Sequence, residues 1–165
     1  MILRAYRDTD LEALIALFRR AVHQGAKRHY SAAERWAWAP RRLDRERFGR
    51  QCQQNFLLLA IADPRTEDRI LGFGDLTESG EIDRLFVHPD HHRQGIATAL
   101  YLALETEARR RGLVELTSNA SYLARPFFER HGFTAIKRQA NPRAGQVLVN
   151  FKMLKSLSPP RPGAS

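Results

Sequence analysis

Residues 92–97 (His-Arg-Gln-Gly-Ile-Ala) have the composition of an anion-binding turn at the start of a helix. They follow an alternating apolar stretch over residues 82–87, and a helical pattern runs from residue 95 to about residue 111. A strand, a short polar turn and a helix start bring free backbone N–H groups and the positive end of the helix dipole together. Gly95 lets a ligand approach the backbone, and Ala97 leaves the first helical turn unhindered. The segment therefore suits a phosphate or pyrophosphate.

Two common phosphate-binding patterns, G-x-x-x-x-G-K-[ST] and G-x-G-x-x-G, are absent from the chain. The segment instead resembles the acetyl-coenzyme A loop of the GCN5-related N-acetyltransferase (GNAT) family, [QR]-x-x-G-x-[GA]. Gly95 and Ala97 match this pattern, and His92 stands where the family has Gln or Arg. An ordinary strand–turn–helix connection is the alternative explanation of the glycine.

A second segment, residues 120–133, resembles the helix that the same family has near its C-terminal end, N-x-x-A-x-x-[FY]-[FY]-x-x-x-G-F. Ser121 stands at the Asn position, and the matching residues are Ala124, Phe127, Phe128, Gly132 and Phe133. The two motifs occur in the family's order and separation. The resemblance covers about residues 2–154.

The resemblance implies how acetyl-CoA (acetyl-coenzyme A) binds. The pantetheine arm would pair with the backbone of the strand before the loop, at Leu85, Phe86 and Val87. Ser121 would contact the pantetheine. The pyrophosphate would bind the backbone amides of Arg93, Gln94, Gly95, Ile96, Ala97 and Thr98.

Acetyl transfer to an amine requires a base and a polarised thioester carbonyl. Glu81 is the first candidate base, by resemblance to the histone-acetylating members, and Asp83 is the second. Strand alternation predicts that Glu81, Asp83, Leu85 and Val87 share one face. A solvated Glu81 and an Asp83 paired with an arginine are the alternatives. The oxyanion donor would be a backbone N–H near Phe86 or Val87.

The leaving thiolate also needs a proton. Phe128 stands where the family often has a tyrosine, and a phenyl ring has no proton to donate. Tyr122 is the candidate general acid in its place. A packing or surface role for Tyr122, with protonation by solvent, is the alternative.

The resemblance places the acceptor site beside residues 23–38. His29, Tyr30 and Glu34 are candidate substrate-binding residues, because aromatic rings and a carboxylate suit a cationic amine. Packing or surface positions are the alternative for such residues. Ser31 and Glu34 also form a capping-box pattern for a helix over residues 32–38.

The remaining patterns predict a mixed α/β (α+β) fold, with a mostly antiparallel sheet flanked by helices. The expected order is β-α-α-β-β-β-α-β-α-β-β, with a further helical stretch over residues 43–54. Strands are expected over residues 2–6, 55–62, 70–76, 81–87, 113–118, 133–138 and 147–154, and the other helices over residues 11–23, 32–38, 95–111 and 121–131. Residues 1–155 would form one GNAT domain, followed by a disordered Pro-rich tail over residues 156–165.

Composition limits the expected location, metal content and partners of the protein. No apolar run approaches the ~20 residues of a membrane span, and no signal peptide is recognised, so a cytoplasmic protein without a membrane partner is expected. The single cysteine, Cys52, excludes an internal disulfide and a cysteine-based zinc site. The three histidines of residues 88–92 lack spaced acidic partners, so no metal is expected. The net charge of +9 is attributed first to an Arg-rich solvated surface and second to coenzyme capture, which makes nucleic acid the less favoured partner.

The sequence therefore predicts an acetyl-CoA-dependent N-acetyltransferase that acts by direct transfer in a ternary complex. The acceptor would be a primary amine, either a small molecule or a peptide. The alternatives are a non-catalytic acyl-CoA-binding sensor and a basic nucleic-acid-binding module. The sequence is compatible with a homodimer.

Overall fold

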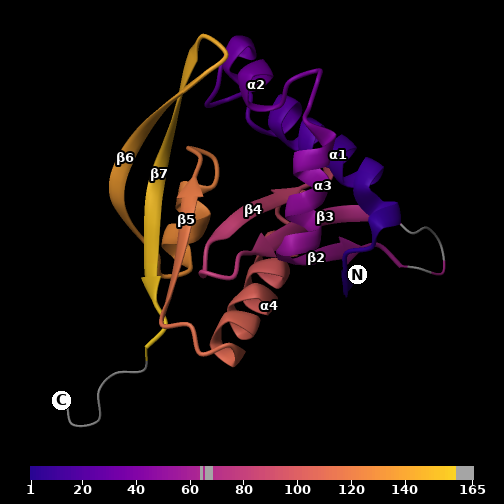
Figure 1. Ribbon diagram of the computed structural model, residues 1–165, viewed down its shortest axis with the longest axis vertical. Coiled ribbons are helices and arrows are strands. Elements are labelled where there is room, and N and C mark those ends of the chain that lie inside the picture. Colours follow the sequence, from indigo (N-terminus) through magenta and orange to yellow (C-terminus); the bar gives the residue numbers. More distant parts are fainter. Residues whose placement is uncertain (64, 66–68, 159–165) are drawn as a thin grey trace.

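The computed structural model describes residues 1–63, 65 and 69–158, and its strands form two antiparallel sheets (Figure 1). The first sheet has the order β1 (Ile2–Ala5), β2 (Phe56–Ile61), β3 (Ile70–Leu76) and β4 (Ile82–Val87). The second has the order β5 (Glu115–Ala120), β7 (Gln146–Ser156) and β6 (Thr134–Arg143). An isolated parallel bridge between Glu81 and Thr117 joins the two sheets.

Helices cover both faces of the first sheet. α1 (Leu11–Arg20), which continues into a π-helical turn (Ala21–Gly25), and α3 (Arg45–Gln54) pack on one face, and α4 (Ile96–Arg110) packs on the other (Figure 1). α2 (Ala32–Trp38) lies beside the β6–β7 hairpin, and α5 (Arg125–Arg130) follows β5. Short 3-10 turns occupy Asp8–Asp10 and Pro89–His91.

The mixed, mostly antiparallel fold expected from the sequence is confirmed. The capping box of Ser31 and Glu34 also forms, and it starts α2 at Ala32. Hydrophobic periodicity and local capping are sufficient to produce these elements, because each depends on residues that are close in sequence.

Three predicted boundaries differ most from the structure, and the ends of several other elements are shifted by one to three residues. The helix expected over residues 121–131 is reduced to α5, because the chain turns at residues 122–124 and Pro126 occupies its first turn. The strand expected over residues 133–138 extends to Arg143, through pairing with the long β7. Ser156 and Leu157 belong to the fold and not to a tail: β7 reaches Ser156, and the N–H of the buried Leu157 donates to the Val114 carbonyl (2.8 Å). Ser158 is an exposed residue after β7, and the remaining residues of the expected tail, 159–165, lie outside the described residues.

Two glycines of β3 let α4 approach the sheet closely. A Cβ at Gly72 would lie 2.9 Å from the Phe86 carbonyl oxygen and 3.0 Å from Ile96 Cγ2. A Cβ at Gly74 would lie 2.9 Å from Leu85 Cδ1. Side chains at these two positions would push α4 away from β4, so the glycines fix where this helix begins relative to the strand.

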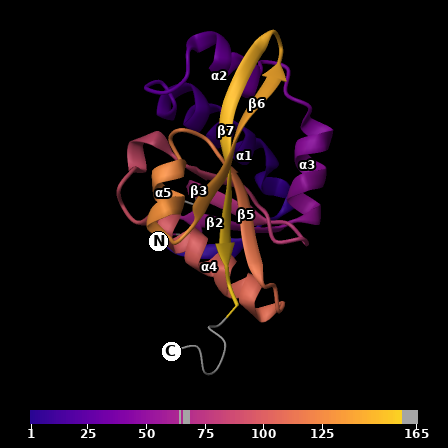
Figure 2. The same cartoon turned by 90° about the vertical axis from the view of Figure 1, so that its left-hand side faces the viewer.

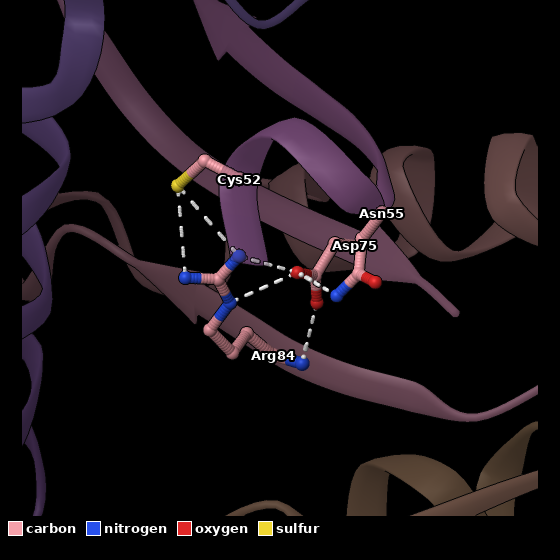
Figure 3. Close-up of polar contacts among 4 residues, drawn as sticks. All are labelled: Cys52, Asn55, Asp75 and Arg84. Atoms are coloured by element: carbon pink, nitrogen blue, oxygen red, sulfur yellow. Dashed lines mark hydrogen bonds and ion pairs between the residues drawn. The ribbon is translucent and has the colours of Figure 1, made fainter. Parts of the chain in front are cut away.

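A buried ion pair joins β3 to β4 (Figure 3). The carboxylate of the fully buried Asp75 accepts from Arg84 Nε (2.9 Å), from the Arg84 backbone N–H (2.8 Å) and from the Asn55 side-chain amide (2.9 Å). The Arg84 guanidinium also contacts the Cys52 sulfur and lies over the Phe48 ring. Such a buried pair is tolerated because each charge is met by the other and by further hydrogen bonds.

No helix among residues 1–63, 65 and 69–158 combines the length and the apolar character that crossing a membrane would need.

Candidate active site

The two sheets separate along β4. At its start, the Thr117 N–H donates to the Gly80 carbonyl (3.0 Å) and the Ser118 hydroxyl donates to the Ile82 carbonyl (2.9 Å). Beyond Ile82, β4 pairs only with β3 among the described residues, so its other edge is open. The His88 N–H donates to the Leu71 carbonyl on the β3 side (2.8 Å). Because N–H groups alternate along a strand, those of Leu85 and Val87 face the open edge.

A β-bulge at Asp83 changes which side chains share a face. Arg84 is opposite Asp75 and Ile82 is opposite Leu76, so Asp83 is the extra residue. Leu85 and Val87 consequently pack toward α4, in a cluster with Ile96 and Leu100. The expectation of one face for Glu81, Asp83, Leu85 and Val87 is therefore wrong, because strand alternation is interrupted at the bulge.

The loop between β4 and α4 has the geometry of an anion site. Gly95 is the N-cap of α4, with a φ of +78°, and a Cβ added there would meet nothing within 4 Å. The Ala99 N–H donates to the Gly95 carbonyl (3.0 Å), which starts the helical hydrogen bonds. Across the described parts of the chain, the amides of residues 95–98 have no hydrogen-bond acceptor. Four free N–H groups at a helix start, with open space above a glycine, are suited to bind a phosphate group.

A cavity of about 830 Å³ lies at the separation of the sheets. One side is formed by β4, the end of β5 and α5, through Leu85, Phe86, Ala120, Ser121, Ala124 and Phe128. The other side is formed by the α2–α3 segment and the tip of the β6–β7 hairpin, through Trp38, Arg42, Asp44, Arg47 and residues 141–144. The hairpin tip and α2 lie near each other at this end of the molecule (Figures 1 and 2). The volume is enough for the end of a coenzyme arm and a small acceptor.

Two carboxylates stand at the start of β4, and both have raised pKa values. Burial is the main cause for Glu81, and the negative charges of Asp83 and Asp75 raise its pKa further. The Asn119 amide donates to the Glu81 carboxylate (3.0 Å), which lowers that pKa, as Lys152 also does.

Asp83 lines the cavity. The surrounding protein desolvates its carboxylate and raises its pKa, the charge of Asp75 acts in the same direction, and Arg84 and Arg47 oppose the shift. Its side chain remains exposed on the cavity side. Glu81 is not among the residues lining the cavity, and Asn119, its hydrogen-bond donor, is. Asp83 can therefore touch an acceptor directly, whereas Glu81 needs an intervening water.

The residues of the second motif divide into cavity and core. Ser121 lines the cavity, and its hydroxyl accepts from the Ala124 N–H (3.1 Å). Phe128 also lines the cavity, although its side chain is buried against Phe133. Tyr122 is not among the lining residues: its ring packs on Phe151, and its backbone N–H donates to the Tyr30 hydroxyl (3.1 Å).

The three predicted acceptor-site residues have different surroundings. Tyr30 lines the cavity, but its hydroxyl is bound on both sides, because it donates to the Val149 carbonyl (2.8 Å) and accepts from Tyr122. His29 is stacked on the Tyr122 ring, outside the lining. Glu34 is half-buried, and its carboxylate caps α2. The structure thus brings only Tyr30 of this group to the cavity.

Other polar residues at the cavity were not anticipated from the sequence. They are Arg42 and Arg47 around the start of α3, Asn119 on β5, and Asn141, Arg143 and Asn150 on the β6–β7 hairpin. The length of β6 decides whether the hairpin reaches the cavity, and the sequence predicted too short a strand there. The sequence contains an arginine cluster at positions 41, 42, 45 and 47, but this pattern alone does not indicate which of its side chains face a cavity.

Comparison with known proteins gives consistent results. A family model described as "Acetyltransferase (GNAT) domain" matches residues 26–155. The uncharacterized N-acetyltransferase YafP of Escherichia coli (strain K12) is 36% identical over 152 residues, which are 92% of this chain and 93% of that protein. A GCN5-related N-acetyltransferase structure from Rhodopseudomonas palustris has a TM-score of 0.89 and 33% identity, over 94% of this chain and 95% of that chain. The PaiA N-acetyltransferase of Thermoplasma acidophilum, in complex with coenzyme A, shares the fold, with a TM-score of 0.75 and 20% identity over 94% and 98% of the chains.

The fold and the family match define a coenzyme A-dependent acyltransferase. The chain belongs to the GNAT family, and it is an acetyl-CoA-dependent N-acetyltransferase.

Proposed function

We propose that this protein transfers an acetyl group from acetyl-CoA directly to a primary amine, with both substrates bound at once. The observation that carries the proposal is the meeting of the open β4 edge and the carboxylate of Asp83 in one cavity. An extended arm along the edge would bring its thioester to the same space as an amine held by the carboxylate. Holding both reactants in one cavity removes much of the entropic cost of a bimolecular step.

The chain supplies two binding elements for acetyl-CoA. The amides at the start of α4 would bind the pyrophosphate, with Arg93, Gln94, Gly95, Ile96, Ala97 and Thr98 forming the loop around it. The outward carbonyl groups of Leu85 and Val87 and the Val87 N–H would pair with the pantetheine amides as a neighbouring strand does. The Leu85 N–H is then our choice of oxyanion donor, because Leu85 lines the cavity, whereas Val87 does not and the Phe86 N–H points toward β3.

The carboxylates of Asp83 and Glu81 would have different roles toward the acceptor amine. Asp83, at the cavity surface, attracts the ammonium form of the amine, and Glu81 takes the proton through a water. The charge of Asp83 helps to make Glu81 more basic. The neutral amine nitrogen then attacks the thioester carbon, and the oxyanion forms at the Leu85 N–H. The carbon–sulfur bond breaks, the nitrogen loses its second proton to solvent to leave the amide, and solvent returns a proton to the coenzyme A thiolate to give the thiol.

Direct transfer is favoured over an acetyl-enzyme because the one cysteine is unsuited to attack. Cys52 is buried, and burial raises the pKa of its thiol despite the nearby Arg84. It is also not among the residues lining the cavity. A thiol with a raised pKa holds little thiolate at neutral pH and is a poor nucleophile.

Steady-state kinetics over a panel of primary amines tests the proposal. Intersecting double-reciprocal lines, with no acetylated protein detected by mass spectrometry before the amine is added, are expected. Parallel lines with an acetylated protein would instead show a covalent route. Binding of acetyl-CoA without transfer to any amine would identify an acyl-CoA sensor.

Gly95→Val is expected to weaken acetyl-CoA binding by roughly 10-fold or more, because the added side chain occupies the space above the free amides. Gly112→Val is the matched control: Gly112 has a φ of +75°, close to that of Gly95, and is also open around its Cβ position, but it follows the C-terminal end of α4. Both variants place a valine at a similar positive φ. Calorimetry showing equal affinity in the two folded variants would contradict the coenzyme site.

Tyr122→Phe is expected to keep turnover within about 3-fold of the unchanged protein, since the Tyr122 side chain is not at the cavity. Solvent then protonates the thiolate, whose conjugate thiol has a pKa near 8.5 and needs little assistance. Measurements of kcat and of acetyl-CoA affinity check this. A fall of 100-fold in kcat with unchanged affinity would restore Tyr122 as the general acid.

A further inference from the structure

We propose that the acceptor amine also carries an anionic group, carboxylate or phosphate, which binds to Arg42, Arg47 and Arg143 at the cavity. This inference rests on the proposed function and adds the class of the acceptor.

The three arginines converge on the cavity from three parts of the chain. Arg42 lies between α2 and α3, Arg47 lies on α3, and Arg143 ends β6 at the hairpin tip. Within the described residues, none of the three side chains has an ion pair or a hydrogen bond. Two other α3 arginines differ: Arg45 pairs with Glu12 and Arg50 pairs with Glu46. The arginine of α3 at the cavity is thus the one left available for a ligand.

Acetyl-CoA does not account for these cations. Its phosphates belong at the start of α4, and no residue of the 92–98 loop lines the cavity. The part of the coenzyme that would reach the cavity, the pantetheine arm with its acetyl thioester, carries no charge. Arg84 also lines the cavity, but its charge is met by Asp75. The three arginines, which are exposed at the cavity, are therefore available to an anion that the coenzyme does not supply.

The acidic residues of the cavity do not supply an anion for these three arginines either. Asp44 lines the cavity, but its carboxylate accepts from the Arg47 backbone N–H (3.0 Å) and caps α3. Asp83 forms no ion pair with Arg47, although that arginine is close enough to lower its pKa. An acceptor with an ammonium beside Asp83 and an anion at the arginines would complement both sets of charges.

The charge pattern also disfavours some acceptors. A polyamine would bring several positive charges against three arginines, and this repulsion lowers its affinity. Arginine binds carboxylate and phosphate in the same forked geometry. The favoured class is therefore a small amphoteric amine, either an amino acid or short peptide with a free carboxylate, or an aminoalkyl phosphate.

Matched acceptor pairs test the inference. The first pair is phenylalanine and phenethylamine, and the second is O-phosphoethanolamine and ethanolamine; each pair differs in the anionic group. For at least one pair, kcat/KM is expected to be 10-fold or more higher for the anionic member. A preference in the first pair alone identifies a carboxylate, and one in the second alone identifies a phosphate.

Arg42→Gln, Arg47→Gln and Arg143→Gln should then each reduce the preference for the anionic member about 10-fold, through a higher KM with kcat largely kept. Arg138→Gln is the control, because Arg138 lies on the same strand as Arg143, is exposed and is not among the lining residues. Amines that are acetylated equally well with and without the anion overturn the inference and leave the proposed function intact. An anion preference that survives in all three variants also overturns it. Acetyl-CoA binding with no transfer to any amine overturns both proposals.

Discussion

Glu81→Gln is expected to lower turnover about 100-fold near neutral pH, the usual scale for the loss of a general base. Glutamine keeps an oxygen that can accept from Asn119 but cannot take a proton from the amine. The anion site at the start of α4 is untouched, so acetyl-CoA affinity should be unchanged. Stopped assays of kcat, with calorimetric affinities, give both quantities.

The direction in which the acidic limb of the pH–rate profile moves identifies the base. Glu81 must be deprotonated to act, and its raised pKa places the acidic limb of the rate profile above the range of an exposed glutamate, about 4.3. In Glu81→Gln this limb should vanish, and the deficit should shrink at high pH, where the amine is already neutral. Asn119→Leu removes a hydrogen bond that favours the charged carboxylate, so it should move the limb to higher pH.

Two comparisons make the result specific. Glu78→Gln, in the exposed turn three residues earlier, is the matched control and should leave the profile unchanged. Asp83→Asn should raise the KM for the amine, because the proposed role of Asp83 is to hold the ammonium. If the acidic limb vanished in Asp83→Asn and persisted in Glu81→Gln, Asp83 would be the base.

Arg84→Met is expected to reduce the free energy of unfolding by about 3–5 kcal/mol, the cost of leaving a buried charge without its partner. Asp75 is fully buried, and it would keep only the Asn55 amide and the backbone N–H of residue 84. Urea denaturation followed by circular dichroism measures the loss. An effect below 1 kcal/mol would mean that water reaches Asp75.

Two further variants distinguish the effect of burial on stability from the effect of losing an ion pair. Arg45→Gln breaks the exposed pair with Glu12 and should cost at most about 1 kcal/mol. The double variant Asp75→Leu, Arg84→Met should recover much of the stability, because no charge is then left buried. It should still lose activity. The Arg84 N–H at the bulge depends on the Asp75 carboxylate in place of a strand carbonyl, so Asp83 would lose its fixed position.

The fold and the start of α4 at the proposed coenzyme loop could be predicted because their signals are local. Gly95 at a helix start and the Ser31–Glu34 cap depend on a few neighbouring residues, and both are present in the structure. The relative orientation of Glu81 and Leu85 could not be predicted. Simple alternation places them on one face, but the bulge between them depends on pairing with β3.

The acceptor side was the least predictable part. Glu34 and His29 had suitable chemistry, but one caps a helix and the other stacks on Tyr122. Arg143 lies at the end of β6, far from Arg42 in the sequence, and it reaches the cavity through the length of a hairpin. No spacing in the sequence relates it to Arg42, because the α2–hairpin contact that brings them together is a long-range one.

The open edge of β4 is also a potential site of aggregation, since an unpaired strand edge can accept a strand from another molecule. Here the second sheet and the α2–α3 segment enclose the cavity into which the edge opens. A thin, flexible pantetheine arm can enter this cavity. A strand of another folded molecule carries side chains and is wider, so it contacts the β6–β7 hairpin before it can reach β4. The second sheet thus blocks the approach of a strand from another molecule to the open edge of β4. Conditions that separate the sheets at the Glu81–Thr117 bridge would expose β4 before the rest of the core, and we expect aggregation of the coenzyme-free protein to begin there.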